Sequence, residues 1–293
     1  MFKSLLTLVL IFAVQFSGFS ARKKVLVIGI DGVRSDCLEA AKTPNIDALI
    51  KSGAYSMNAY AGGELGKKTQ QPTVSGPGWV SICTGVWADV HGVTNNKFEG
   101  YNIEKAPHFF KRIKDQNSKL FLSSITQWHP INDKILKPSV EADFVQNPPD
   151  KGISVRELAL KNLKEKNPDV LFVHFDDVDH AGHAHGYGTD IKKYVKSIEE
   201  TDENIGHLIK EIRSRKDEDW LIVITTDHGG IRKGHGGQSK EERTIFMIAN
   251  GSSVKPGNVD KGPGHTAVAP TVFNHLELKI DKSWGWPAPF AKK

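Results

Sequence analysis

The chain has 293 residues, of which 39% are hydrophobic and 25% are charged, and its formal net charge is +5. These proportions are those of a folded globular protein and exclude a disordered chain. The positive charge weakly favours anionic substrates. Because no long basic run or RNA-type aromatic motif accompanies it, we expect no nucleic-acid-binding module.

The N-terminal 21 residues predict a signal for export. A lysine at position 3 precedes an apolar run over 5–14, and small polar residues follow as far as Ala21. A secretory signal peptide has this pattern, and the run is too short to make a good membrane span. We expect residues 1–21 to be removed and the mature chain to be periplasmic or extracellular, without a stable membrane span. An uncleaved anchor is the alternative.

Residues 22–293 alternate between strand and helix patterns. Apolar runs predict strands at 24–30, 119–126 and 244–250, and strands followed by acidic residues within 170–179 and 220–230. Helical spacing predicts helices at 43–54, 154–166, 190–215 and 269–276, and another that begins near 75–78. This alternation predicts an α/β fold with a largely parallel sheet, in one domain over 22–293.

The chain has two cysteines, Cys37 and Cys83. An exported protein could pair them. Cys83, however, lies in an apolar helical pattern, where a buried free thiol is common, so we expect no disulfide. Without a Cys-x-x-Cys motif, a metal site would have to use histidine and carboxylate side chains.

Side chains that could bind a metal follow three of the predicted strands. They are Asp31, then Asp179 with His183, then Asp227 with His228. Ligands bind at the carboxyl ends of the strands in open α/β sheets, so these side chains can converge although they are distant in sequence. Carboxylates and imidazoles are ligands of zinc, and also of manganese and iron. The sequence therefore predicts a metal site at this edge.

The stretch VDHAGHAHGYG is the richest in candidate ligands. Asp179 and His183 are four residues apart, so on a helix they lie about one turn apart and can reach one cation. His180 and His185 are alternative ligands. We expect these two either to support the site or to lie on the surface.

The stretch SGPGWVSICTG, residues 75–85, places a serine where a loop becomes a buried helix. Ser75 could be an ordinary N-cap, for which serine is a preferred residue, and the stretch taken alone favours that role. Alternatively, its hydroxyl lies among the free backbone N–H groups of the helix start, where an anion binds. Metal ligands elsewhere in the chain favour the second role.

The segments VIGIDG, SGPGWVSICTG, DHAGH and TTDHGG with a later GHGG, in this order, resemble the alkaline phosphatase superfamily. The greatest similarity is to its type I phosphodiesterase/nucleotide pyrophosphatase branch, and it covers nearly the whole mature chain. The resemblance implies a three-layer α/β/α sandwich with a central, largely parallel sheet. It also implies two divalent metal ions side by side, usually zinc, with manganese as the alternative.

The resemblance assigns ligands residue by residue. One metal takes Asp31, Ser75, Asp227 and His228, and the other takes Asp179, His183 and a later histidine. His235 precedes an apolar strand, as the last ligand of the family does, and is favoured. His265, which leads into the helix at 269–276, is the rival. Ser75 is then the nucleophile, and its attack on phosphorus gives a phosphoserine intermediate.

Asn96 occupies the place of an asparagine that donates to a phosphoryl oxygen in the phosphodiesterase branch. Its neighbour Asn95 is the other candidate, and a plain turn is the alternative role. The chain departs from the family at Gly78, where many relatives have asparagine. It is also too short for the large inserts that read substrates in some relatives, so its specificity is not readable.

The favoured activity is hydrolysis of phosphate diesters or nucleotide pyrophosphates. A sulfatase is disfavoured because Trp79 stands where the resemblance would require arginine in Ser-x-Pro-x-Arg. A phosphomonoesterase needs an extra cation for a dianionic substrate, which Arg34, Arg232 or Lys233 could supply. A non-catalytic binding protein should lack at least one ligand, and none is missing. Oligomeric state, leaving group and natural metal are not encoded in any recognisable pattern.

Overall fold

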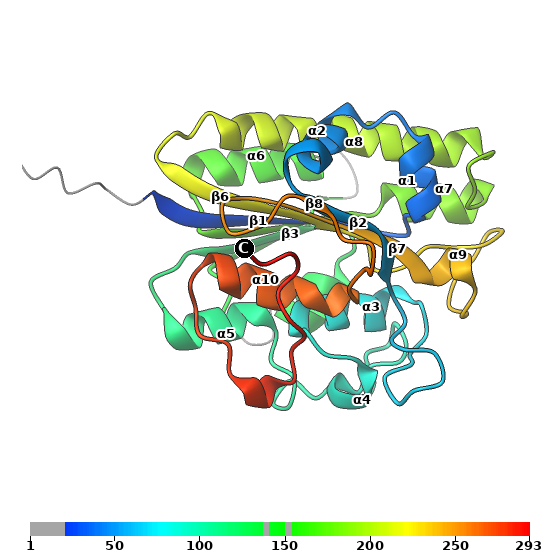
Figure 1. Cartoon of the computed structure of the whole chain (residues 1–293), viewed down its shortest axis with the longest axis horizontal. Helices are drawn as coiled ribbons and strands as arrows, with labels where there is room; N and C mark the ends of the chain where they lie inside the picture. The colour runs from blue at the N-terminus through cyan, green and yellow to red at the C-terminus, as the bar shows by residue number, and fades with distance from the viewer. Residues whose placement is uncertain (1–20, 137–140, 150–153) are drawn as a thin grey trace, which may run out of the picture.

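A computed structural model describes residues 21–136, 141–149 and 154–293 of the chain, and in this part an eight-stranded sheet forms the centre (Figure 1). The strand order is β4-β3-β5-β1-β6-β7-β2-β8. The strands are β1 Arg22–Ile30, β2 Ala54–Tyr60, β3 Leu122–Thr126, β4 Phe144–Gln146, β5 Val170–Phe175, β6 Glu218–Thr225, β7 Thr244–Asn250 and β8 Gly257–Asn258. The predicted signal peptide, residues 1–21, lies outside the described residues except for Ala21.

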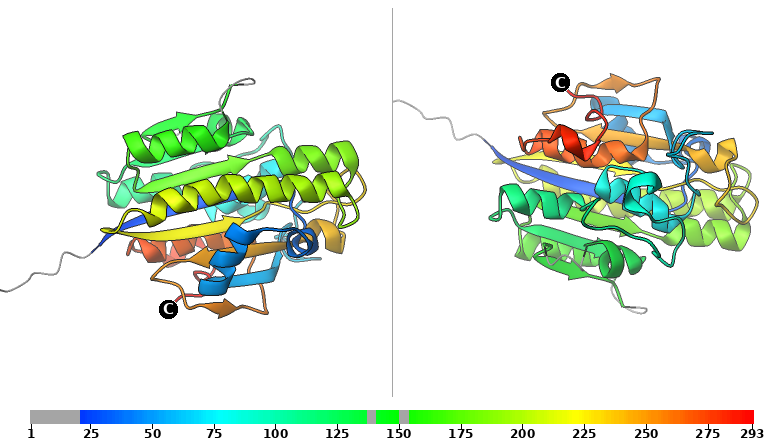
Figure 2. Two further views of the ribbon diagram at one scale, coloured as in Figure 1. Left: turned by 90° about the horizontal axis from the view of Figure 1, so that it is seen from above. Right: turned by 90° about the horizontal axis from the view of Figure 1, so that it is seen from below.

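Helices cover both faces of this sheet, as Figure 2 shows from above and from below. One layer holds α1 Ser35–Ala40, α2 Pro44–Ser52, α6 Val155–Glu165, α7 Asp177–His185 and α8 Lys192–Arg213. The other holds α3 Ser75–Thr84, α4 Ala88–His91, α5 Phe109–Gln116 and α10 Val268–His275. A short helix, α9 Lys240–Arg243, precedes β7, and single turns form at Ile131–Leu136, His265–Ala267 and Lys282–Trp284. The predicted three-layer α/β/α sandwich is confirmed.

The alternation of side chains along β1 explains why both faces are covered. Leu26 and Ile28 belong to the apolar core on the α8 side, whereas Val25 and Val27 belong to the core on the α3 side. All four are fully buried. Successive side chains of a strand point to opposite faces, so a continuous apolar run needs an apolar partner layer on each face.

The sheet is largely parallel, as predicted, but two of its strand pairs are antiparallel. β7 pairs antiparallel with both β6 and β2. β1 is parallel to both β5 and β6, so the carboxyl ends of these three strands meet at one edge. β1 runs from left to right in Figure 1, and this edge lies on the right.

Several boundaries differ from the sequence-based expectation. β5 ends at Phe175, and Asp179 lies not at the strand end but on α7, which starts at Asp177. The strand β2 and the helices α5 and α7 were not predicted as elements. In β2 the alternating burial of AYSMNAY depends on small and mildly polar residues, which give little apolar contrast.

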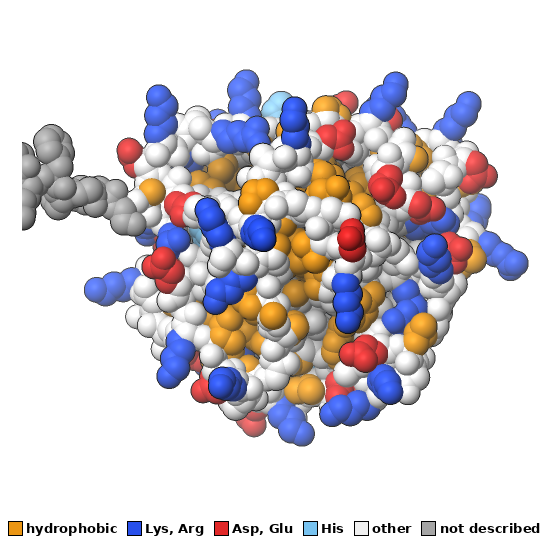
Figure 3. All heavy atoms as spheres, in the orientation of Figure 1, with side chains coloured by type: hydrophobic (Ala, Val, Ile, Leu, Met, Phe, Trp, Pro, Cys, Tyr) orange, Lys and Arg blue, Asp and Glu red, His pale blue; other side chains and the backbone are white. Residues whose placement is uncertain are grey.

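Cys37 and Cys83 are both buried and free, as expected. They belong to the cores on opposite faces of the sheet, which explains why they do not pair. Among the described residues no helix is long and apolar enough to cross a membrane. On the face in Figure 3, Lys and Arg side chains are interspersed with Asp and Glu rather than gathered into one basic patch.

Candidate metal centre

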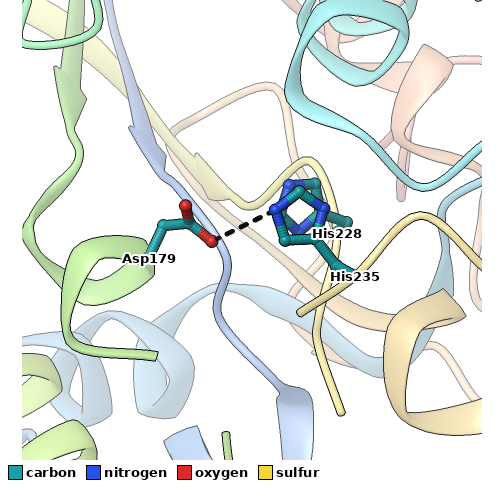
Figure 4. A group of neighbouring side chains, drawn as sticks. All are labelled: Asp179, His228 and His235. Atoms are coloured by element: carbon teal, nitrogen blue, oxygen red, sulfur yellow. Dashed lines mark ion pairs between the residues drawn. The ribbon is translucent and has the colours of Figure 1, made fainter. Parts of the chain in front are cut away.

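Three carboxylates and three histidines converge at the carboxyl edge of the sheet. Asp31 follows β1, Asp227 and His228 follow β6, Asp179 and His183 lie on α7, and His235 lies in the loop before α9. All of these residues except His183 belong to two groups in which one potential ligand atom from each member lies within 4.8 Å of the others. One is Asp31, Asp227 and His228, and the other is Asp179, His228 and His235 (Figure 4). His228 belongs to both groups, so the two adjoin.

Ser75 is the first residue of α3, and Val74 is the N-cap. Ser75 is therefore not the N-cap, and its hydroxyl lies 3.3 Å from His228 Nε2. The side chain of Ser75 therefore faces the first group of ligands and also lies at the N-terminus of α3, the positive end of the helix dipole, which attracts an anion.

The glycines that flank Pro77 allow the start of α3 to pack closely against the loop at Asn95 and against Asp227. A Cβ on Gly76 would lie 2.6 Å from the carbonyl oxygen of Asn95, and one on Gly78 would lie 2.8 Å from Asp227 Cβ. The asparagine that many relatives carry in place of Gly78 would therefore not fit the present arrangement of Asp227.

Each of the three histidines has one ring nitrogen fixed by a backbone carbonyl. The Nδ1 atoms of His228, His183 and His235 lie 2.8, 3.1 and 2.9 Å from the carbonyl oxygens of Gly229, Lys233 and Thr73, respectively. A carbonyl can only accept, so each Nδ1 carries the proton and each Nε2 presents a lone pair. Metal-binding histidines characteristically have this arrangement, in which the second nitrogen donates to a backbone oxygen.

These lone pairs face one another and the carboxylates. The Nε2 atoms of His183 and His235 are 3.1 Å apart, and His183 Nε2 is 3.2 Å from Asp179 Oδ2. His235 Nε2 lies 3.8 Å from Asp179 Oδ1, the pair marked in Figure 4. With Nδ1 as the nitrogen that carries the proton in each ring, neither Nε2 has a proton to donate across the contact between them. A cation between these atoms would turn the repulsion into coordination.

Potential ligand atoms also face one another in the group of Asp31, Asp227 and His228. His228 Nε2 lies 3.3 Å from Asp227 Oδ2 and 3.5 Å from Asp31 Oδ1. Within the described residues neither carboxylate oxygen has a hydrogen-bond partner, although both are buried. Buried polar atoms are nearly always paired, so two unpaired carboxylate oxygens facing one imidazole nitrogen fit a bound divalent cation.

The electrostatics of these side chains agree with this interpretation. Burial, and then the charge of Asp227, raise the pKa of Asp31 well above its usual value. Burial, and then the charge of Asp179, do the same to the pKa of Asp227. Burial and the neighbouring His228 lower the pKa of His235 to about 4, which keeps its imidazole neutral. Neutral imidazoles and crowded carboxylates are what a divalent cation requires of its ligands.

The two asparagines in the loop after α4 differ in their contacts. Asn96 Oδ1 accepts a hydrogen bond of 2.7 Å from the backbone N–H of Gly76, so its amide group lies at the start of α3 beside Ser75. The side chain of Asn96 is exposed, which leaves its NH₂ group accessible. Asn95 Oδ1 instead accepts from Lys97 N at 2.8 Å, a local turn contact.

The remaining candidate histidines lie outside the two groups. His265 is fully buried and its ring stacks on Trp87 at 4.9 Å between ring centres. Neither of its ring nitrogens has a hydrogen-bond partner among the described residues. His180 pairs with Asp176 at 3.1 Å, and His185 is exposed at the end of α7. The structure thus places His235, and not His265, beside His183.

Residues 23–280 match the family described as the Metalloenzyme superfamily. The chain belongs to this superfamily, which is that of the alkaline phosphatases. Its buried Asp and His groups are candidate metal sites of a metalloenzyme, and among its relatives are phosphodiesterases of the ENPP type, to which it is distantly related.

One curated relative and two solved structures illustrate the distance. Bis(5'-adenosyl)-triphosphatase enpp4 of Xenopus laevis is 23% identical over 261 residues, which cover 83% of this chain and 54% of that protein. The chain thus spans about half the length of the curated relatives it matches. Inactive murine ENPP5 in complex with AMP matches with a TM-score of 0.66 and 15% identity, covering 93% and 98% of the two chains. Phosphonate monoester hydrolase from Silicibacter pomeroyi matches with a TM-score of 0.66 and 16% identity, covering 91% of this chain and 76% of that chain. At these identities the structural matches show the fold.

Sequence reasoning missed three side chains of this metalloenzyme that contact the candidate ligands. His174 of β5 and Trp79 of α3 contact Asp31, and Tyr187 contacts Asp179. His174 also forms a further cluster with Asp31 and Asp176. The histidine within the apolar run VLFVHF was the one available signal, because a polar side chain in a fully buried strand needs a partner.

Proposed function

We propose that the chain is an exported phosphohydrolase that cleaves phosphate diesters or nucleotide pyrophosphates, with Ser75 as the covalent nucleophile at a site for two divalent cations, zinc being the expected metal. One observation carries the proposal. The Ser75 hydroxyl, at the start of α3, lies 3.3 Å from His228 Nε2, at the junction of the two Asp/His groups. Export rests on the pattern of residues 1–21 alone.

The proposed ligand sets combine the assignment from the resemblance with the distances between these side chains. Asp31, Asp227 and His228, with the Ser75 hydroxyl, would hold one cation, and Asp179, His183 and His235 would hold the other. When bound, the cations would act as Lewis acids that lower the pKa of the serine hydroxyl and offset charge on phosphoryl oxygens. His228 Nε2 is then engaged as a ligand and is not available as a general base.

The chain's own groups account for the rest of the reaction. Ser75 Oγ, after its proton has passed to solvent, forms a bond to phosphorus while the bond from phosphorus to the leaving oxygen breaks. The positive end of α3 and the amide NH₂ of Asn96, whose oxygen is bonded to Gly76 N–H, would stabilise the non-bridging oxygens. Water then hydrolyses the ester on Ser75, which regains its hydroxyl.

The contacts of the nearby cations support diesters over monoesters. The guanidinium of Arg34 makes two hydrogen bonds to Asp36, of 3.0 and 2.7 Å, and a third to the carbonyl oxygen of Tyr187. Lys233 Nζ donates to the carbonyl oxygen of Ala184 at 2.9 Å. Arg34 and Lys233 are therefore already engaged, so the additional cation that the second negative charge of a monoester calls for would have to be Arg232, which is exposed.

Substrate comparison tests the proposal. Metal is first removed from the protein with a chelator, and hydrolysis is then measured with and without added zinc. The substrates are bis-p-nitrophenyl phosphate, diadenosine triphosphate, p-nitrophenyl phosphate and p-nitrophenyl sulfate. Turnover of the first two that requires both zinc and Ser75 is expected. A preference for the monoester would move the chain towards the phosphomonoesterases. A preference for the sulfate would overturn the argument from Trp79.

A further inference from the structure

One oxygen of Asp31 is occupied by two donors from the protein. Trp79 Nε1 donates to Asp31 Oδ2 at 2.8 Å, and His174 Nε2 lies 3.2 Å from the same oxygen. The other oxygen, Oδ1, has no hydrogen-bond partner in the described part of the chain and lies 3.5 Å from His228 Nε2. The carboxylate is thus held so that only one oxygen faces the candidate metal position.

The protonation of His174 is fixed by its surroundings. The backbone N–H of Trp128 points to His174 Nδ1 at 3.4 Å, so Nδ1 accepts and Nε2 carries the proton that goes to Asp31. His174 is fully buried, and the ring of Trp79 meets it edge-on with 4.7 Å between ring centres. A Cβ on Gly29 would lie 2.4 Å from the Trp79 ring, so β1 leaves space for this indole.

Asp179 is held in the same way in the other group. The hydroxyl of Tyr187 donates to Asp179 Oδ1 at 2.5 Å. The second oxygen, Oδ2, lies 3.2 Å from His183 Nε2, which is closer than the 3.8 Å between Oδ1 and His235 Nε2. Tyr187 is 4% exposed, and a Cβ on Gly182 or Gly230 would lie 2.2 or 2.6 Å from its ring. Glycines on both sides of the ring therefore make room for a side chain whose polar atom reaches a carboxylate ligand.

We infer that Trp79, His174 and Tyr187 are positioning residues that select which oxygen of Asp31 and of Asp179 is presented to the metals. A carboxylate held at one oxygen cannot rotate away from the metal, so less conformational freedom is lost when the metal binds. Removal of an outer partner of this kind typically costs about 10–100-fold in metal affinity. The inference rests on the metal centre of the proposed function.

Tyr187→Phe is the sharpest test, because it removes one hydroxyl and keeps the ring. Zinc binding is measured by competition with a chromophoric chelator, together with the zinc content after gel filtration. We expect one of the two zinc ions to bind about 10–100-fold more weakly and the other to be unchanged. Tyr101→Phe is the matched control, since its buried hydroxyl has no hydrogen-bond partner among the described residues. It should leave both affinities unchanged.

His174 gives a second, independent test. His174→Gln keeps a side-chain N–H donor and should retain more zinc than His174→Met, which fills the space without donating. Loss of zinc by the Met variant with rescue by the Gln variant supports a positioning role. Equal zinc binding by wild type, Tyr187→Phe and His174→Met would overturn the inference and leave the proposed function intact. Failure of the wild type to bind two zinc ions would overturn both.

Discussion

Gly32 follows Asp31 of one candidate ligand group and packs against Asp179 of the other. Gly32→Ala therefore tests how tightly the two groups are packed together. Gly32 has a φ of +65°. An added Cβ would lie 2.3 Å from Asp179 Oδ1, 2.8 Å from Asp179 Cβ and 3.0 Å from Asp179 Cα. Because the last of these atoms is backbone, a rotation of the Asp179 side chain cannot relieve the contact.

Two costs should therefore add in Gly32→Ala. The left-handed conformation costs an alanine about 1–2 kcal/mol. Overpacking of a well-filled site costs typically about 1–3 kcal/mol more. We expect the free energy of unfolding to fall by about 2–5 kcal/mol, and the zinc ion held by Asp179 to be lost because that carboxylate is displaced.

Gly66→Ala is the matched control. Gly66 has a φ of +70°, but nothing lies within 4 Å of an added Cβ. Urea unfolding should show only the conformational cost of about 1–2 kcal/mol, and the zinc content should not change. If both variants lose the same stability and both keep two zinc ions, the contact between Gly32 and Asp179 has no energetic consequence and the reasoning is refuted.

Three further predictions concern the site and the core. Asn96→Ala should lower kcat for a diester by about 10²-fold with little change in zinc content, whereas Asn95→Ala should affect turnover far less, as steady-state kinetics with zinc analysis would show. His235→Ala should abolish binding of one zinc ion in chelator competition, and His265→Phe should not. Burial lowers the pKa of His91 to about 3, so as the pH falls this imidazole is protonated in the unfolded chain at a higher pH than in the folded chain. The stability that neutral His91 contributes should therefore be complete above about pH 6.5, and it should fall by roughly 1.4 kcal/mol per pH unit as the pH drops towards 3. Thermal unfolding of His91→Gln should lack this contribution to the pH dependence.

The sequence predicted the layers and the edge of the sheet well, for a physical reason. Apolar runs such as VLVIGI must be buried on both faces, and parallel strands place their carboxyl ends together. Asp31, Asp227 and His228 could therefore be brought together from strand positions alone. The spacing of Asp179 and His183 indicated one helical turn, and both residues lie on α7.

The rest depends on contacts between distant segments. The antiparallel pairing of β7 is not visible in its apolar run, because a strand buried on both faces has the same pattern in either direction. Placing His235 beside His183 needs the path of the loop after β6. The hydrogen bonds of Trp79 and His174 to Asp31 join α3 and β5 to the end of β1, and no local sequence pattern predicts them.

The most direct test of the central claim is to look for the covalent intermediate itself. Zinc-loaded protein is mixed with bis-p-nitrophenyl phosphate, quenched in acid within the first turnover, digested and examined by mass spectrometry. The account predicts a p-nitrophenyl phosphate ester on the peptide that contains Ser75, absent after chelation, and a fall in turnover on the order of 10³-fold or more in Ser75→Ala. Turnover of Ser75→Ala at the wild-type rate, or an adduct on a different residue, would contradict it.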